Sequence, residues 1–184
     1  MKFQVQIHHS DQTEAIDASR LTKAIRMMAL DVGIQQGRIS IAILSDPEMK
    51  ELNRQYLDHD YETDVISFNL SDDDDFLDGE LLLGADTARR VAAEVGWRPE
   101  DELLLYAIHG MLHLLGYEDD TPEQRDEMRV QERHYLQSLR VRGWERHPTH
   151  GEAHSDLPED SHGDSHGDSH GDSHGGGSSE EIEF

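Results

Sequence analysis

Two histidines four residues apart, followed by an aspartate, form the strongest chemical pattern in the sequence. They lie in the run HGMLHLLGYED, which spans residues 109–119. Histidines at this spacing share one face of a helix, with Cβ atoms about 5–6 Å apart, so both rings can reach one ion. Gly116 permits a sharp turn after the helix because glycine adopts positive φ readily. The pattern therefore predicts one zinc ion per chain, held by His109, His113 and Asp119.

The spacing His-x3-His-x2-Gly-x2-ligand is also that of the metzincin zinc peptidases, but two differences weaken this likeness. Position 110 is Gly, where a zinc peptidase has the Glu that activates water. Position 119 is Asp rather than His, and its oxygen is an acceptable but harder zinc ligand, which widens tolerance toward manganese. Histidine pairs at this spacing also occur in protein cores without a metal, so a purely structural pair is the alternative interpretation.

The periodicity of the apolar residues predicts the elements that position these ligands. Alternating apolar residues indicate strands, and apolar stripes at helical spacing indicate amphipathic helices. The predicted strands lie at 3–7, 39–43, 65–68 and 80–83, and the predicted helices at 16–32, 46–56, 86–95, 99–115 and 121–142. The expected fold class is α+β: a mixed four-stranded sheet packed with about five helices, with the metal-binding helix at the centre.

Several helix boundaries are predicted from capping residues. Pro47 suits the first turn of a helix that begins after Ser45. Asp86 is a candidate N-cap for the third helix. Gly116 is expected to end the metal-binding helix, and the run from Thr121 to Gln124 is a capping box that begins the last helix.

The composition changes near Trp144 and divides the chain into two parts. Residues 1–144 form the single predicted folded domain. Residues 145–184 repeat Ser, His, Gly and Asp without an apolar period and contain seven of the 13 histidines. Such a segment cannot offset its ordering entropy by burial, so we expect a disordered acidic tail. The tail could chelate divalent metals weakly, although a merely solvated segment is the simpler interpretation.

Charge and residue usage exclude several classes of protein. The chain has a formal charge of −24. It contains no cysteine, so disulfides, thiolate zinc fingers and iron–sulfur clusters are excluded. No segment approaches the about 18 apolar residues of a membrane span, and the N-terminus does not resemble a signal peptide. We therefore expect a cytoplasmic protein without membrane contact. Its negative charge should repel free nucleic acid at long range.

Two charged clusters carry weaker expectations. The acidic loop 71–75 is expected to be solvated, and its spacing does not match an EF-hand calcium site. Arg125, Arg129 and Arg133 are four residues apart on the last predicted helix. We expect them to pair with Glu neighbours four residues away on that helix, and contact with RNA phosphates is the alternative.

Three blocks in order along the chain resemble the YbeY family of bacterial ribosomal-RNA maturation factors, which are metal-dependent single-strand endoribonucleases. The family pattern His-Gly-x-Leu-His-Leu-x-Gly-Tyr-Asp-His is similar to the run 109–119. The other two blocks are LNRQY at 52–56 with TDVISF at 63–68, and GELLL at 79–83. The resemblance covers roughly residues 3–140.

The resemblance implies an α+β fold, a zinc ion, and roles in 16S rRNA 3′-end maturation and ribosome quality control. His109 and His113 match the family's metal ligands directly. Asp119 matches the third ligand by position only, because the family has His there. The implied substrate is an rRNA precursor, and the acidic surface suggests that the ribosome or a ribosomal protein presents it.

The resemblance also suggests candidates for the proton-transfer step, with one departure. Glu80 stands where the family has Asp and is expected to line the site. Glu80 or Glu118 is expected to accept the proton from the attacking water. The family's functional Arg corresponds to Leu57 here, so that role does not transfer. Two alternatives to the nuclease stay open: a metal-dependent peptidase or other hydrolase, and a non-catalytic ribosome-assembly factor in which zinc only braces the fold.

Overall fold

The computed structural model of the chain describes residues 3–10, 18–57, 63–71, 76–144 and 147. Every structural statement below refers to these residues. The elements in chain order are β1 Gln4–His9, α1 Ala18–Asp31, β2 Gly37–Leu44, α2 Asp46–Leu57, β3 Val65–Asn69, β4 Leu77–Gly84, α3 Ala85–Val95, α4 Pro99–Leu114 and α5 Pro122–Ser138. The expected α+β fold, with a mixed four-stranded sheet and five helices, is confirmed in this part of the chain.

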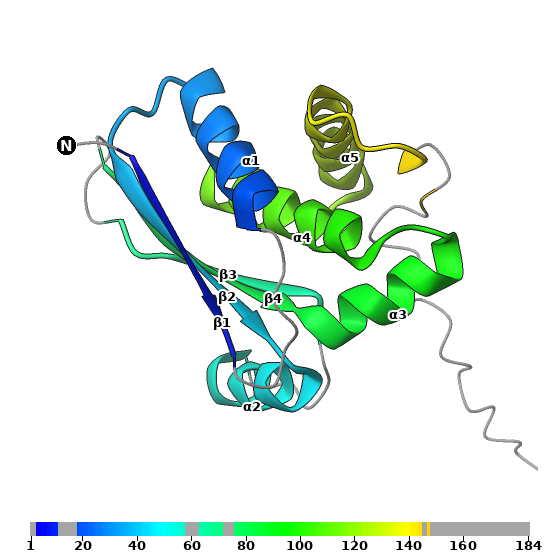
Figure 1. Cartoon of the computed structure of the whole chain (residues 1–184). Coiled ribbons are helices and arrows are strands. Elements are labelled where there is room, and N and C mark those ends of the chain that lie inside the picture. Colours follow the sequence, from blue (N-terminus) through cyan, green and yellow to red (C-terminus); the bar gives the residue numbers. More distant parts are fainter. Residues whose placement is uncertain (1–2, 11–17, 58–62, 72–75, 145–146, 148–184) are drawn as a thin grey trace, which may run out of the picture. The chain divides into compact units, whose positions relative to one another are not determined.

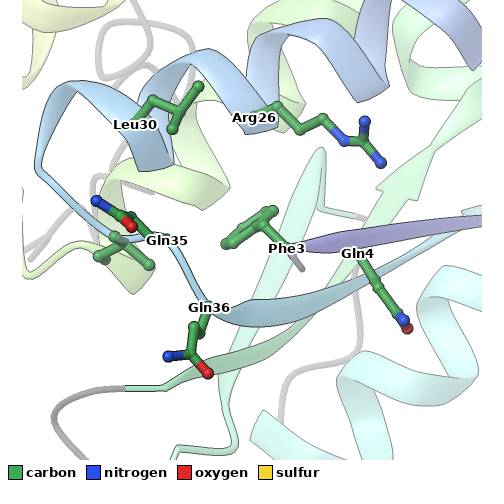
Figure 2. A pocket seen from close by; sticks show the side chains of 7 residues that line it. Phe3, Gln4, Arg26, Leu30, Gln35 and Gln36 are labelled. Carbon is green, nitrogen blue, oxygen red and sulfur yellow. The ribbon is translucent and has the colours of Figure 1, made fainter. Parts of the chain in front are cut away.

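The four strands form one sheet in the order β1-β2-β4-β3 (Figure 1). Strands β1, β2 and β4 are parallel, and β3 lies antiparallel to β4 at the edge. Parallel neighbours need a crossover connection, and α1 supplies it between β1 and β2. A surface hollow of about 630 Å³ lies beside α1, where Phe3, Leu30 and Gln36 are among its lining residues (Figure 2).

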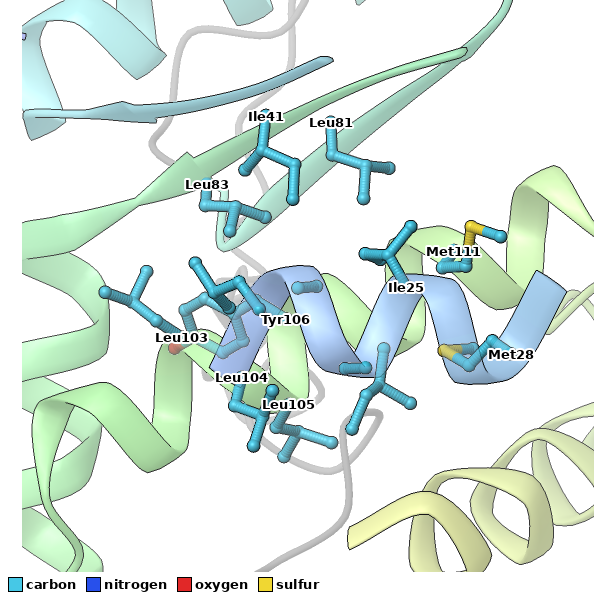
Figure 3. Packing of buried hydrophobic residues seen from close by; sticks show 14 of the residues in the cluster. Ile25, Met28, Ile41, Leu81, Leu83, Leu103, Leu104, Leu105, Tyr106 and Met111 are labelled. Carbon is cyan, nitrogen blue, oxygen red and sulfur yellow. The ribbon is translucent and has the colours of Figure 1, made fainter. Parts of the chain in front are cut away.

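Helices cover both faces of the sheet. On one face, α1 and α4 pack against the alternate residues of β2 and β4, and Figure 3 shows Ile41, Leu81 and Leu83 facing Ile25 and Tyr106. On the other face, a smaller cluster of Met49, Ile66 and Leu82 lies under α2. Strand β4 therefore buries apolar side chains on both faces, as expected for a central strand that is covered on each side.

Helix α4 is the central helix of the domain, as predicted. Nearly all of its residues are buried, because the sheet, α1, α3 and α5 all pack around it. A helix that is apolar all round belongs inside a domain. The polar side chains that α4 does carry are therefore held by specific partners.

The start of α4 is fixed by an ion-pair cluster around Asp101. Arg98 from the preceding turn and Arg20 from α1 both donate hydrogen bonds to the Asp101 carboxylate. Burial alone would raise the pKa of this carboxyl, but the two arginines outweigh it and hold the pKa below its usual range. The carboxylate also lies at the positive end of the helix. This cluster ties α4 to α1 and so fixes the base of the helix that carries the two histidines.

The predicted helix ends are confirmed at some positions and wrong at others. The capping box is present, since the Thr121 hydroxyl accepts from the Gln124 N–H and the Gln124 side chain accepts from the Thr121 N–H. Asp86 is not an N-cap: α3 begins directly after β4 with Gly84 as its N-cap, so Asp86 falls inside the first turn, where it pairs with Arg89. The last helix ends at Ser138, four residues earlier than predicted.

The predicted tail boundary lies close to the edge of the described residues. Residues 145–146 and 148–184 fall outside the described part, so the disordered tail and its metal binding stay predictions. His147 lies on the tail side of that boundary, yet its ring packs on Trp97 with centroids 4.5 Å apart and its Nε2 lies 2.8 Å from the buried carboxylate of Glu102. The packed domain therefore includes at least this one residue beyond Trp144.

A search of the described helices for membrane-crossing segments gives a negative result, since none of them combines the necessary length with the necessary apolar character.

Candidate metal centre

Helix α4 brings the rings of His109 and His113 together, as their spacing predicts. The ring centroids are 4.6 Å apart at an interplanar angle of 89°. The two Nε2 atoms face each other at 3.1 Å. His109 is buried and His113 is half-buried, so the pair lies at the border between the core and solvent.

The turn after α4 returns a carboxylate to this pair. Gly116 adopts a φ of 90°, which favours glycine, and the Tyr117 N–H bonds back to the carbonyl of Leu112. Asp119 Oδ2 then lies 3.7 Å from His109 Nε2 and 3.9 Å from His113 Nε2. The structure thus gathers all three predicted ligands into one group whose donor atoms lie within 4.8 Å of one another.

The outer nitrogens of the two rings fix which atoms face the centre. His109 Nδ1 lies 2.7 Å from Oε1 of the buried Glu132, and His113 Nδ1 lies 3.0 Å from the carbonyl oxygen of Tyr117. A carbonyl oxygen only accepts hydrogen bonds, so His113 Nδ1 is the donor to Tyr117, while the Glu132 carboxyl group is the partner of His109 Nδ1. The Nε2 atoms of both rings then face the centre, beside the Asp119 carboxylate.

This donor set fits a divalent metal ion. Two nitrogen lone pairs and a carboxylate repel one another unless a proton or a cation lies between them. The three donor atoms are separated by 3.1, 3.7 and 3.9 Å, so small movements of these side chains would let all three bind one ion. A partner on the outer nitrogen of a metal-binding His is the usual arrangement, because it fixes the tautomer and makes the ring a stronger ligand.

Glu132 is the member of this centre that the sequence analysis missed. It lies on α5 and is 4% exposed, among the apolar side chains of Met128 and Tyr135 on the same helix face. Its place on the apolar face of the helix is a signal for such a role, since a carboxylate rarely occupies a core position of an amphipathic helix without a specific partner.

Replacing Glu132 by Gln should weaken metal binding. The amide keeps an acceptor oxygen but loses the negative charge that strengthens His109 as a ligand, so we expect zinc affinity to fall about 10- to 100-fold. Competition of the purified, demetallated protein with a chromophoric chelator measures this. Glu127→Gln, an exposed change on the same helix, is the control. Equal affinities in both variants would show that Glu132 only fills space.

The structure separates the two predicted proton acceptors. Glu118 is exposed in the same turn as Asp119, where its Oε2 accepts a 2.7 Å hydrogen bond from Gln124. Glu80 lies on the other face of the sheet. Gly79 faces Leu114 of α4, and strand side chains alternate between faces, so Glu80 points away from α4. The structure does not bring Glu80 to the metal centre.

The arginines of α5 do not pair as predicted with glutamates one turn away. Arg125 Nη1 donates to the backbone carbonyls of Asp119 and Asp120, at 2.9 and 3.0 Å. Arg129 pairs with Asp126, three residues before it. Arg133 is exposed. Arg125 therefore holds the segment that carries the third ligand, while contact with RNA stays a prediction.

Gly110 has a packing role that explains why this position has no catalytic Glu. A Cβ atom at residue 110 would lie 2.9 Å from both Ser67 Oγ and Val65 Cγ2 on β3. The Ser67 hydroxyl also donates to the Gly110 carbonyl at 3.2 Å. Position 110 therefore faces the sheet, whereas the two histidines face α5 and the turn. A glutamate here could not reach the metal centre, which argues against the peptidase alternative.

Two glutamates line a surface hollow near the turn that carries Asp119. A hollow of about 420 Å³ borders the turn after α4, and Glu118 and Glu127 are among its lining residues. Neither this hollow nor the larger one beside α1 includes any of the three ligands among its lining residues. Leu57, which stands in the place of the family's Arg, ends α2, but its side chain lies outside the described part. The acidic loop 72–75 lies outside it as well.

Comparisons with known proteins agree on one family. The family model for Endoribonuclease YbeY matches residues 4–140. Endoribonuclease YbeY of Chlorobaculum tepidum is 38% identical over 125 residues, covering 68% of this chain and 90% of that protein. The Salinibacter ruber protein of the same name is 33% identical over 141 residues, covering 72% and 90%. A solution structure of TM1509 from Thermotoga maritima matches with a TM-score of 0.53 at 27% identity, covering 73% of this chain and 88% of that one.

Proposed function

Because the chain belongs to the YbeY family of endoribonucleases, we propose that it is a zinc-dependent single-strand endoribonuclease that acts in 16S rRNA 3′-end maturation and ribosome quality control. One observation carries the metal dependence: His109, His113 and Asp119 direct three donor atoms at one point. The contacts of both Nδ1 atoms support the same conclusion, since they orient the two rings so that both Nε2 atoms lie on the side of Asp119.

The three ligands would hold the ion while other residues of the chain orient the reaction. A zinc ion held by these residues would lower the pKa of a coordinated water toward about 7 and would polarise a phosphoryl oxygen. Glu132 orients the His109 ring through its buried hydrogen bond, and Arg125 holds the backbone of the Asp119 segment. Glu118 is the proposed proton acceptor, because it lies beside Asp119 and is open to solvent, whereas Glu80 points away from α4.

The charge of the molecule supports a presented substrate rather than free RNA. The chain carries a formal charge of −24, and acidic side chains line the hollow beside the turn that bears Asp119. Long-range repulsion should therefore weaken binding to isolated RNA. We propose that the ribosome or a ribosomal protein brings the rRNA precursor to the centre.

The test compares two substrates and two metal states. Protein treated with a chelator and then desalted should leave the 3′ precursor of 16S rRNA intact, and added Zn²⁺ should restore cleavage. Cleavage should be faster on precursor ribosomal particles than on the same RNA free of protein. The proposal would be overturned if the chelated protein cut as well as the zinc-loaded one, or if neither substrate were cut after zinc was restored.

A non-catalytic assembly factor is the second candidate. The observation that favours it is Leu57 in the place of the family's functional Arg, because a phosphoryl-transfer site usually offers a cation to the developing charge. This candidate predicts that removing the metal unfolds the domain instead of stopping a reaction.

A further inference from the structure

We propose that Asp119 makes this centre unusually tolerant of manganese, so that the site binds Mn²⁺ as well as Zn²⁺. The inference rests on the metal centre of the proposed function and concerns which ion that centre accepts. It starts from the composition of the donor set, which is two imidazole nitrogens and one carboxylate oxygen.

Ligand chemistry is the first part of the argument. Imidazole suits zinc, copper, iron and nickel, whereas carboxylate oxygen suits the harder ions, including manganese. A carboxylate also adds a negative charge that a third histidine would not supply. Zinc still binds more tightly than manganese at any such site, following the usual order of divalent metals. Asp119 is therefore expected to reduce the difference in affinity between Zn²⁺ and Mn²⁺, while Zn²⁺ still binds more tightly.

Access to solvent is the second part of the argument. The side chain of Asp119 is 40% exposed and that of His113 is 30% exposed, against 10% for His109. The ligands thus approach from the protein side, while the Asp119 side of the centre is open to water. Tetrahedral zinc needs one further ligand after three protein donors, but manganese prefers six oxygen-rich positions. An open side supplies the several water molecules that the larger coordination shell requires.

The placement of Asp119 is the third part of the argument, because it is fixed by backbone contacts that do not involve the carboxylate. Arg125 donates to the carbonyls of Asp119 and Asp120, and the positive φ of Gly116 sets the turn. The carboxylate itself lies beyond hydrogen-bonding distance of both rings, at 3.7 and 3.9 Å. It is therefore held near the centre yet free to adjust to ions of different size.

The experiment measures the ratio of the dissociation constants for Mn²⁺ and Zn²⁺ in the full chain and in Asp119→His. Both proteins carry serine in place of the six tail histidines, which removes competing ligands: His150, His154, His162, His166, His170 and His174. His147 is kept because it bonds to buried Glu102. Free Mn²⁺ is followed by electron paramagnetic resonance, and Zn²⁺ by competition with a chromophoric chelator.

We expect the Mn²⁺-to-Zn²⁺ ratio to rise about tenfold or more in Asp119→His, because the harder ligand is lost. Asp119→Asn is a second variant that preserves the shape of the side chain. It should weaken the binding of Mn²⁺ more than the binding of Zn²⁺. Ratios that agree within threefold among all three proteins would overturn the inference. His113→Ala defines the background, and a parent protein that bound neither ion better than this variant would overturn the metal centre itself and the proposed function with it.

Discussion

His113→Ala is expected to abolish metal binding at the centre and to reduce RNA cleavage by at least about a thousandfold, while the domain stays folded. The variant removes one of three donors that the structure gathers around one point. Its effect on the fold should be small, because the ring is half-buried and its protein contacts are a backbone carbonyl and the other ring. We expect the free energy of unfolding of the metal-free protein to change by less than about 1 kcal/mol.

Three measurements on the same preparation check this result: zinc content by elemental analysis, chemical unfolding followed by circular dichroism, and cleavage of the 16S precursor. His134→Ala is the matched control, since His134 is an exposed histidine on α5 and is not one of the predicted ligands. If His113→Ala lost its fold along with its metal, and the parent protein cut no precursor, the assembly factor braced by zinc would be the better description.

Gly110→Glu is expected to destabilise the domain by at least about 3 kcal/mol and to yield no peptide cleavage. The new side chain would start within 3.0 Å of Ser67, Val65 and Leu81, which line the interface between α4 and the sheet. It would also place a carboxylate in a buried, apolar position. The substitution that would complete a zinc-peptidase sequence should therefore disrupt the structure that carries the ligands.

Urea unfolding measures the loss of stability, and a peptide substrate tests for the new activity. Gly110→Ala is the graded comparison, because its single methyl group meets only the ends of side chains and should cost much less. Gln137→Glu adds the same charge at an exposed position of α5 and should leave stability nearly unchanged. A stable Gly110→Glu protein that cleaved peptides after zinc loading would revive the peptidase alternative.

The metal ligands were predictable because their geometry is local. Two histidines four residues apart must share a helix face, and a glycine just beyond them permits the turn that returns Asp119. The elements themselves were equally predictable, since the periods of the apolar residues are strong throughout residues 3–144. Helix α4 could be identified as central for the same reason, because it is apolar on all sides.

Sequence patterns could not decide which face of the sheet a strand residue occupies relative to the site. Strand β4 buries Leu81 and Leu83 on the face of α4 and Leu82 on the face of α2. With apolar residues on both faces, the pattern of β4 does not indicate which face α4 covers. The resemblance predicted Glu80 at the site, whereas the packing of Gly79 against Leu114 indicates that its side chain lies on the other face of the sheet.

By itself, then, the sequence determined which three residues come together as candidate ligands, whereas only the tertiary structure decided which residues support them. Glu132 lies 23 residues beyond His109, on a different helix, and no local rule connects the two. Their hydrogen bond exists because α5 packs across α4. The same holds for Gly110, whose lack of a side chain is required by β3, an element more than 40 residues earlier in the chain. Contacts of this kind depend on how whole elements pack. In a single sequence the only sign of them is an isolated charged residue or glycine among the apolar residues of a helix.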